Sequence, residues 1–489
     1  MSEHRTPRWP QALFWAGLAA TITGLGVWQT LAFNTLWMWW RSGGWIYTLF
    51  AAVIVAASLI LVTDDYRTPY PGWLVATSVM AGGAAVLASI GVGLFQGWRA
   101  DAGLFLASVT ITQDATLPEY DTRAPFTVAE NQTASHMTLN GVLAETTYIP
   151  TTAHFATLVA DKGVFQGYRE IVWQQVSDSG QSVAGNCRFA AGGRRFNGPF
   201  WSNLQRAIIR RAGPELITQS DAYGVCVDGQ AKIIVPLKTY RGLVYTYQVP
   251  DGVAVVDSDW NITIDRDVTP GEYPGPVYPM SLAVKQREST TGLGSWWDHV
   301  QNRVGYQPTS DSKTETNLTE FLLERADRTG ADFVTPLALV GQSQSINAVG
   351  VVAASENHAG VLNPYRVIVL DPPRQANSAV IDRLHADYGN LQEWAAGMAV
   401  YEIVPTGPAT WQATMGMPKA IIYVARINAD GTSCLFSARD GALVGCSTDK
   451  PGATVPPTGG GLSGLSDQDL ARLLQQVSCE IAKRQGLPC

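Results

Sequence analysis

Charged residues are scarce between residues 12 and 98, and this pattern contrasts with the rest of the chain. Three uncharged stretches, at residues 12–33, 44–63 and 73–98, are each long enough to cross a hydrocarbon core of about 30 Å as a helix. Tryptophans stand near their ends, where an indole ring lies in the membrane boundary. The pattern predicts three N-terminal transmembrane helices in a membrane domain at residues 1–100, with the lipid bilayer as a partner. A cleaved signal peptide is the alternative for the first stretch, but two further stretches follow it.

Glycine and alanine recur along the third stretch, for example at Gly82, Gly83, Gly91 and Gly93. Small residues let helices approach each other closely in a membrane. Two interpretations stay open. The small residues pack among the chain's own helices, or they contact a protein partner or a second copy of the chain in a homo-oligomer.

Cysteine placement predicts the compartment of the large C-terminal region. The six cysteines all follow the third stretch, and an even set on one side of the membrane suits an oxidising compartment. The lysines and arginines near the spans weakly favour a cytoplasmic N-terminus. We therefore expect a multi-pass protein of the cell membrane, with its N-terminus in the cytoplasm and its large C-terminal region extracytoplasmic.

Local spacing favours particular disulfides. Two of the cysteines fall on neighbouring predicted strands, and the last two are joined by a tail that folds back. The favoured pairs are Cys434 with Cys446, Cys479 with Cys489 and, as the remaining pair, Cys187 with Cys226. Metal binding is the alternative, but the sequence has no C-x-x-C pair and no histidine at ligand spacing from a cysteine. We expect neither a metal nor a cofactor.

The region after residue 100 combines helical and strand-like patterns of apolar residues, and it predicts an α+β fold with antiparallel meanders. Residues 101–140 are rich in threonine and are expected to form a stalk. A first α+β unit, at residues 141–290, contains a helical pattern at 200–212 that ends at Gly213. Closely spaced strand patterns follow it, and their short connections require antiparallel pairing.

A second α+β unit is expected at residues 291–446. Asn317 followed by Glu320 is typical of a helix N-terminus and predicts a helix through the apolar residues that follow. Another helix is expected at 378–388. A terminal hairpin at 420–436, continued by a third strand, completes the unit.

The C-terminal tail divides into two parts. Residues 447–465 are rich in proline and glycine and predict a linker. Residues 466–489 predict a C-terminal helix with a disulfide loop, because a capping box precedes apolar residues at helical spacing. The apolar stripe consists of Leu470, Leu473, Leu474, Val477 and Ile481. Such a stripe must be buried, so we expect the helix to dock on the ectodomain or on a protein partner.

The densest basic cluster lies around the helix expected at 200–212. It consists of Arg194, Arg195, Arg206, Arg210 and Arg211. One reading is a solvated helix face, and the alternative is an anion-binding surface for an acidic envelope polymer or a lipid headgroup. The whole chain has 34 Lys and Arg against 41 Asp and Glu, a net charge of −7, so we expect no nucleic-acid partner.

Three short motifs resemble functional sites, and each has a simpler structural reading. Residues 296–299 combine two tryptophans with an acid and a histidine, as a sugar-binding platform would, but Ser295 and Asp298 match a capping box. Residues 257–261 open like a calcium loop yet lack its glycine and its glutamate. Residues 447–450 have the S-x-x-K spacing without the accompanying motifs.

The sequence contains no complete catalytic constellation. We interpret the chain as a membrane-anchored extracytoplasmic binding or assembly protein of the cell envelope without catalytic activity. One alternative is an envelope enzyme that acts on cell-wall polymer or a lipid-linked substrate, using an acid pair such as Asp371 and Glu356. The other is a sensor of an ectodomain ligand.

Overall fold

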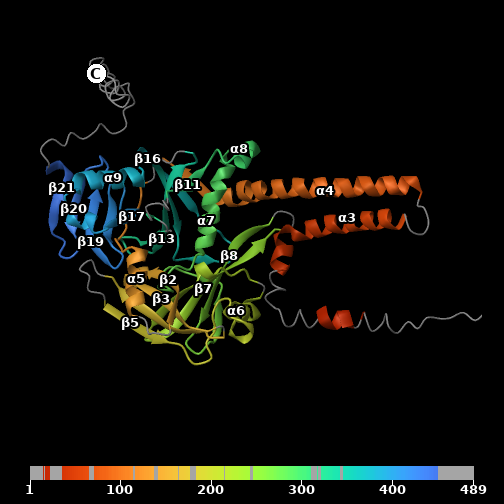
Figure 1. Ribbon diagram of the computed structural model, residues 1–489, viewed down its shortest axis with the longest axis horizontal. Helices are drawn as coiled ribbons and strands as arrows, with labels where there is room; N and C mark the ends of the chain where they lie inside the picture. Colours follow the sequence, from red (N-terminus) through yellow and green to blue (C-terminus); the bar gives the residue numbers. More distant parts are fainter. Residues whose placement is uncertain are drawn as a thin grey trace, which may run out of the picture.

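The structure is a computed structural model, in which a pair of helices projects from a β-rich globular region (Figure 1). It describes residues 15, 17–22, 36–64, 71–113, 116–136, 141–163, 165–176, 183–213, 215–242, 246–309, 316–317, 321–341 and 345–449. The mixed α+β class expected from the sequence is confirmed, and nearly all the strand pairs of the described residues are antiparallel.

The projecting helices are α3 (Trp45–Asp64) and α4 (Gly72–Ala100), which pack against each other. A β-carbon added at Gly82 would lie 3.4 Å from Ala57 Cβ, and one added at Gly93 would lie 2.9 Å from the Tyr47 hydroxyl. Gly82 and Gly93 therefore let α3 approach closely, whereas Gly83 and Gly91 have no described atom within 4 Å of an added β-carbon. Packing among the chain's own helices is seen at two of the four glycines, and a contact with a partner or a second copy stays a prediction.

One helix among the described residues, Gly72–Phe95 within α4, is long and apolar enough to cross a membrane. The structure thus supports one of the three expected spans by length and composition. The second expected span coincides with α3, and most of the first lies outside the described residues.

A central six-stranded sheet lies next to the end of α4. Its order is β1 (Val109–Thr112), β16 (Tyr365–Gln375), β14 (Ser345–Ala353), β13 (Ala331–Leu339) and β11 (Tyr306–Pro308), with β12 (Phe321–Glu324) also pairing with β13. The expectation of a stalk at 101–140 is wrong, because β1 pairs in parallel with β16 and α5 (Phe126–His136) packs on neighbouring strands. The β-branched run of β1 forms a strand, which threonine content alone does not reveal.

Two four-stranded antiparallel sheets form the next unit. The first is β2 (Gly141–Ile149), β3 (His154–Asp161), β4 (Tyr168–Gln175) and β5 (Val183–Arg188). The second is β6 (Tyr223–Val227), β7 (Gln230–Arg241), β8 (Tyr247–Val256) and β9 (Ile262–Asp265), which confirms the expected meander. Leu158 and Ile171 of the first sheet and Ile233 of the second share one core.

Helix α6 (Leu204–Ala212) covers part of this unit, as the sequence predicts. Asn203 caps it by accepting a hydrogen bond from the amide of Arg206 at 2.7 Å, and Gly213 follows its end. The short helix η6 (Gln219–Asp221) lies between α6 and β6. Around the boundary expected at residue 290 lie the short helices α7 (Met280–Glu288), η7 (Ser289–Leu293) and α8 (Trp296–Val300). A two-stranded sheet joins β10 (Asp267–Val268) to β15 (Asn357–His358).

A five-stranded meander ends the described chain. It consists of β17 (Ala399–Pro405), β18 (Trp411–Met417), β19 (Ala420–Ile427), β20 (Ser433–Ser437) and β21 (Leu443–Cys446), and it packs with α9 (Asn377–Tyr388) and α10 (Gln392–Ala395). The terminal hairpin and the helix at 378–388 are confirmed.

The helix expected after Asn317 is wrong. Phe321, Leu322 and Leu323 form the buried strand β12, and the Asn317 side chain bonds to both backbone groups of Ile403 in β17, at 2.8 and 3.1 Å. A short run of consecutive apolar residues has no periodicity that separates a buried strand from a helix.

Two disulfides stabilise the globular region. Cys187 on β5 is bonded to Cys226 on β6, with 6.0 Å between the Cα atoms, so this bond joins the two sheets of one unit. Cys434 and Cys446 are directly opposite on β20 and β21 and form the second bond. Both are pairs that the sequence favours. Cys479, Cys489, the predicted C-terminal helix and most of the predicted linker lie outside the described residues.

Candidate functional site

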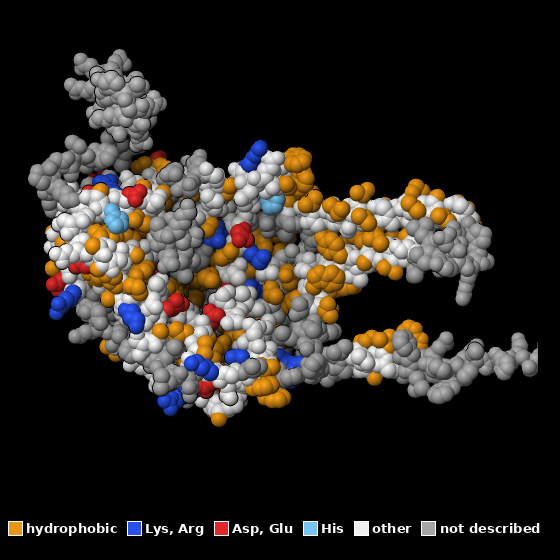
Figure 2. Space-filling view, viewed as in Figure 1, with side chains coloured by type: hydrophobic (Ala, Val, Ile, Leu, Met, Phe, Trp, Pro, Cys, Tyr) orange, Lys and Arg blue, Asp and Glu red, His pale blue; other side chains and the backbone are white. Residues whose placement is uncertain are grey.

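A cavity of about 370 Å³ lies where the disulfide-linked unit meets the central sheet. Its walls include Phe126, Glu130, Ala144, Glu145, Thr146, Thr147, Ser220, Asp221, Pro276, Tyr278, Met280, Leu322 and Phe333. Figure 2 shows this part of the surface hollowed, with acidic side chains near the hollow. The volume falls within the roughly 300 to 1,000 Å³ of small-molecule sites.

Carboxylates give the cavity its chemical character. Glu130 comes from α5, Glu145 from β2 and Asp221 from η6, while the apolar wall is formed by side chains such as Leu322 and Phe333. Neither lysine nor arginine lines it among the described residues. An apolar cavity with a few convergent polar groups of one sign is typical of a specific ligand site.

Among the described residues, no salt bridge to Glu130 or Glu145 is seen, in contrast to Asp221. Partial burial raises the pKa of both groups, of which Glu130 is the more exposed. At Glu145 a hydrogen bond of 2.9 Å from the Gln219 side chain opposes the shift, and the charge of Glu130 adds to it. Because the charge of Glu130 disfavours the ionised form of Glu145, a cation bound near both carboxylates would be favoured.

Asp221 differs because a buried lysine balances its charge. Lys238 Nζ lies 3.2 Å from the Asp221 carboxylate, and the whole lysine is only 2% exposed. Ser281 donates from its amide and its hydroxyl to the same carboxylate, at 2.9 and 2.5 Å. Burial lowers the pKa of Lys238, and the Asp221 charge opposes that shift.

This cluster resembles a serine–lysine catalytic pair, but its hydrogen bonds point to a structural role. An ammonium group has three N–H donors. Those of Lys238 are directed at Asp221, Thr218 and Ser281. No lone pair is left to take a proton from the Ser281 hydroxyl, so the cluster holds Asp221 in the cavity wall and does not activate a nucleophile.

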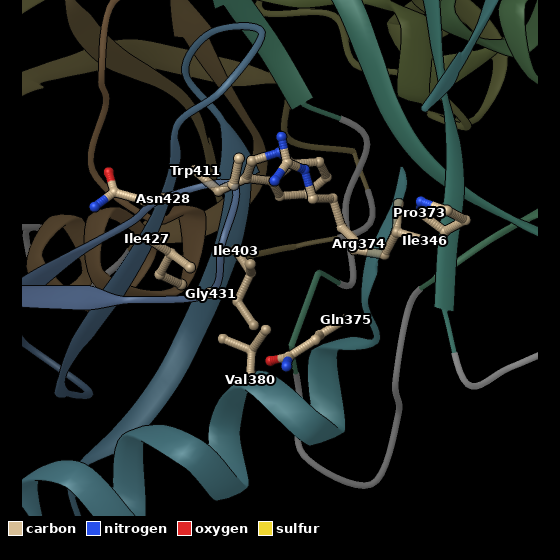
Figure 3. Close-up of a pocket in the computed structure, with 11 residues that line it drawn as sticks. Ile346, Pro373, Arg374, Gln375, Val380, Ile403, Trp411, Ile427, Asn428 and Gly431 are labelled. Atoms are coloured by element: carbon tan, nitrogen blue, oxygen red, sulfur yellow. The ribbon is translucent and has the colours of Figure 1, made fainter. Parts of the chain in front are cut away.

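A second, smaller cavity of about 50 Å³ lies between the end of β16 and the terminal meander. Figure 3 shows Arg374 and Trp411 side by side in it, above Ile403 and Val380. Arg374 Nη2 donates to the carbonyl of Pro408 at 3.2 Å, whereas Arg374 Nε and Trp411 Nε1 are buried without an acceptor among the described residues. Burial lowers the pKa of Arg374. This volume suits ordered water, which would satisfy such donors.

The predicted arginine cluster lies at both ends of α6 and just before it. Arg195 pairs with Asn203 at the start of α6, while Arg210 and Arg211 are exposed in its last turn. Arginines in the last turn of a helix interact favourably with the negative end of the helix dipole, which explains these residues without a ligand. Anion binding by these arginines stays a prediction.

Two of the three short motifs have a structural role in place of a ligand site. The capping box is confirmed, since Ser295 Oγ accepts from the Asp298 amide and the Asp298 carboxylate accepts from the Ser295 amide at 3.0 Å. The Asp257 carboxylate accepts from the amides of Asp259 and Asn261 and so forms a turn. No group of His, Cys, Asp and Glu in the described part of the chain could hold a metal ion.

Two remaining site candidates gain no support from the described residues. The Ser447 hydroxyl is buried and accepts from the Ser433 amide at 3.0 Å, and its S-x-x-K lysine lies outside the described residues. The acid pair is wrong because Asp371 lies near the far end of β16, whereas Glu356 precedes its start. Asp371 lies six residues along the strand from Tyr365, a distance of about 20 Å.

Sequence reasoning missed the cavity carboxylates because they come from elements far apart in the chain. Glu130, Glu145 and Asp221 follow no motif spacing. The one available signal is Lys238, a single cation in the otherwise apolar run at 233–238. A buried lysine requires a buried carboxylate, but the sequence does not identify which one.

The chain was compared with protein-family models, with curated proteins and with solved structures. None of the three comparisons finds a match.

Proposed function

We propose that the chain is a membrane-anchored extracytoplasmic binding protein of the cell envelope, and that its cavity holds a ligand carrying an amine or a guanidinium group. The observation that carries the proposal is a cavity lined by three carboxylates and by no lysine or arginine among the described residues. Lys238 already balances Asp221, so Glu130 and Glu145 are left to compensate the charge of the ligand. The apolar wall suits a hydrocarbon portion of the same ligand.

The anchoring proposal includes three spans and a cytoplasmic N-terminus. Arg41, just before α3, donates to the carbonyl of Tyr240 in β7 at 3.2 Å. The start of α3 therefore lies at the globular region, as does the end of α4 (Figure 1). If α3 and α4 both span the membrane, the start of α3 and the end of α4 lie on the same side of it. A cytoplasmic N-terminus with the globular region outside therefore requires one further span before α3. The two disulfides support an extracytoplasmic position for that side.

Reporter fusions after Tyr66 and after Thr110 test this topology. A reporter that is active only outside the cytoplasm should be active at Thr110 and inactive at Tyr66. The reverse result would overturn the assignment.

Assembly is the second part of the proposed role. The predicted helix at 466–489, tethered by the 447–465 linker, would dock through its apolar stripe on a protein partner or on a second copy of the chain. Deleting residues 451–489 should leave both described disulfides formed and weaken the assembly contact. Loss of those disulfides in the truncated chain would instead place the helix in the core.

The ligand proposal is tested by binding to the full chain in detergent micelles. Spermidine and lysine amide are suitable cationic probes, with glycerol as the neutral comparison, and the readouts are thermal stabilisation and calorimetric titration. The double variant Glu130→Gln with Glu145→Gln should abolish stabilisation by both cations. The matched control is Glu288→Gln, since this glutamate is exposed on α7 and leaves the cavity unchanged. Equal stabilisation of all three proteins would refute the cavity as the site.

A further inference from the structure

An exposed apolar patch, which we call the α8 patch, lies beside the point where α4 leaves the proposed membrane. It consists of Leu293, Trp297 and Val300, which are 44%, 63% and 49% exposed. Trp297 and Val300 are three residues apart on α8, the spacing that places side chains on one face of a helical turn, and Leu293 ends the preceding η7. Large apolar side chains that gather on one exposed face mark an interaction surface.

The position of the α8 patch near the end of α4 indicates that it faces the proposed membrane. Helix α4 leads into η2 (Asp101–Phe105), η2 packs against η7, and η7 leads into α8. The apolar part of α4 ends at Phe95, so η2 begins about 9 Å further along the helix axis, within the headgroup region of a bilayer. Figure 1 places α8 beside the end of α4 at the globular region, and Figure 2 shows hydrophobic side chains on α8 there.

The patch is held in a fixed shape. The Ser295 and Asp298 capping box orients the first turn of α8, and the carbonyl of Asp298 accepts from the Arg303 amide at 2.9 Å. Thr291 Oγ1 lies 3.1 Å from His299 Nδ1 and ties α8 to the preceding segment. Because the exposed side chains are presented on an ordered turn, contact with a partner needs little further ordering.

The side-chain chemistry fits a lipid surface. Tryptophan prefers the boundary between headgroups and acyl chains, where its ring is apolar and its N–H stays hydrated. Arg303 is also exposed near the patch, and an exposed cation there suits phosphate headgroups.

We propose that the α8 patch inserts into the outer boundary of the bilayer and forms a contact separate from the spanning helices. This inference rests on the proposed membrane anchoring. The additional contact fixes how the globular region tilts against the membrane, because helices at one edge alone leave that angle free. The acidic cavity is then held in a constant orientation to the membrane surface.

Depth measurements on the full chain in phosphatidylcholine and phosphatidylglycerol vesicles test the proposal. Val300→Cys is labelled with an environment-sensitive fluorophore, and quenching is measured with lipids that carry a nitroxide near the headgroup. The control is Val183→Cys on β5, a valine with 61% exposure whose strand lies away from the helix pair in Figure 1. Headgroup nitroxides should quench the probe at 300 by about twofold and leave the probe at 183 unchanged.

A third probe separates this inference from the anchoring. Leu87→Cys lies in the middle of α4, where the leucine is 73% exposed, and nitroxides near the bilayer centre should quench it. Quenching at 87 together with no quenching at 300 would overturn the α8 contact alone. Absence of quenching at 87 would overturn the anchoring and this inference with it.

Discussion

Lys238 Nζ lies 3.2 Å from the Asp221 carboxylate, and the two groups form a buried ion pair directly behind the acidic cavity. Thr218 and Ser281 complete the hydrogen bonds of the amine. The pair joins β7 to η6 and thereby fixes one carboxylate of the cavity wall.

Removing the amine should destabilise the chain strongly. Lys238→Met keeps the length of the side chain but leaves the Asp221 charge buried without a cation, which costs about 3 to 5 kcal/mol. The double variant with Asp221→Asn should cost less than the single one, because no buried charge remains. The free energy of unfolding from urea titrations checks both. Lys232→Met on the same strand is the control, and a similar loss there would show that the buried pair is not the cause.

The pH dependence of cation binding follows from the raised pKa values of Glu130 and Glu145. A carboxyl group binds a cation only when deprotonated, and burial shifts deprotonation to higher pH. Affinity for spermidine should therefore rise as the pH increases through these raised pKa values, and then level off. Calorimetric titration over a pH series measures this. Glu145→Gln should weaken binding and leave a shallower pH profile, whereas an unchanged profile would contradict the role of this carboxyl.

Local signals in the sequence are sufficient for much of the fold. The helix capped by Asn203, the terminal hairpin and the Cys434–Cys446 bond all depend on residues close together in the chain. The mistakes occur where tertiary contacts decide. Glu402 of β17 binds Arg123 at 3.2 Å and the Phe126 amide at 3.3 Å, and these buried contacts attach the supposed stalk to the globular region. No local pattern near Arg123 indicates that its partner, Glu402, lies almost three hundred residues later in the chain.

The cavity could not be predicted for the same reason. Its walls come from α5, β2, η6, α7, β12 and β13. Each carboxylate reads as an ordinary surface acid in its own segment, and only the packing of these elements brings them together. Sequence patterns identify residues that cap a helix, pair in a sheet or span a membrane. Charged residues that come together only when separate elements pack have no regular spacing in the sequence.

Loss of either disulfide should destabilise the globular region, and by different amounts. The Cys187–Cys226 bond closes a sequence separation of 39 residues and the Cys434–Cys446 bond one of 12. Chain entropy gives about 4 and about 3 kcal/mol for these loops. Replacing each pair by serines and measuring the free energy of unfolding checks the order, with the larger loss expected for Cys187 and Cys226. The opposite order would indicate that residual structure in the unfolded chain outweighs loop length.

The last prediction concerns stability against pH. Burial raises the pKa of Glu215 to about 8, although Arg266 lies 3.2 Å from its carboxylate. The neighbouring Asp251 adds to this rise through its charge and a hydrogen bond to Glu215, and Arg266 contacts both carboxylates. A carboxyl whose pKa is higher in the folded state than in the unfolded state binds its proton more tightly when folded. Its contribution is fully present below the unfolded value and is lost as the pH rises to about 8.

The free energy of unfolding should therefore fall between the ordinary glutamate pKa and about pH 8 in the wild-type chain. Glu215→Gln carries no proton to lose, so its unfolding free energy should fall less over the same range. Glu272→Gln is the matched control, because this glutamate is exposed. Parallel slopes for wild type and Glu215→Gln would contradict the raised pKa, and would mean that Arg266 keeps the Glu215 carboxyl ionised throughout.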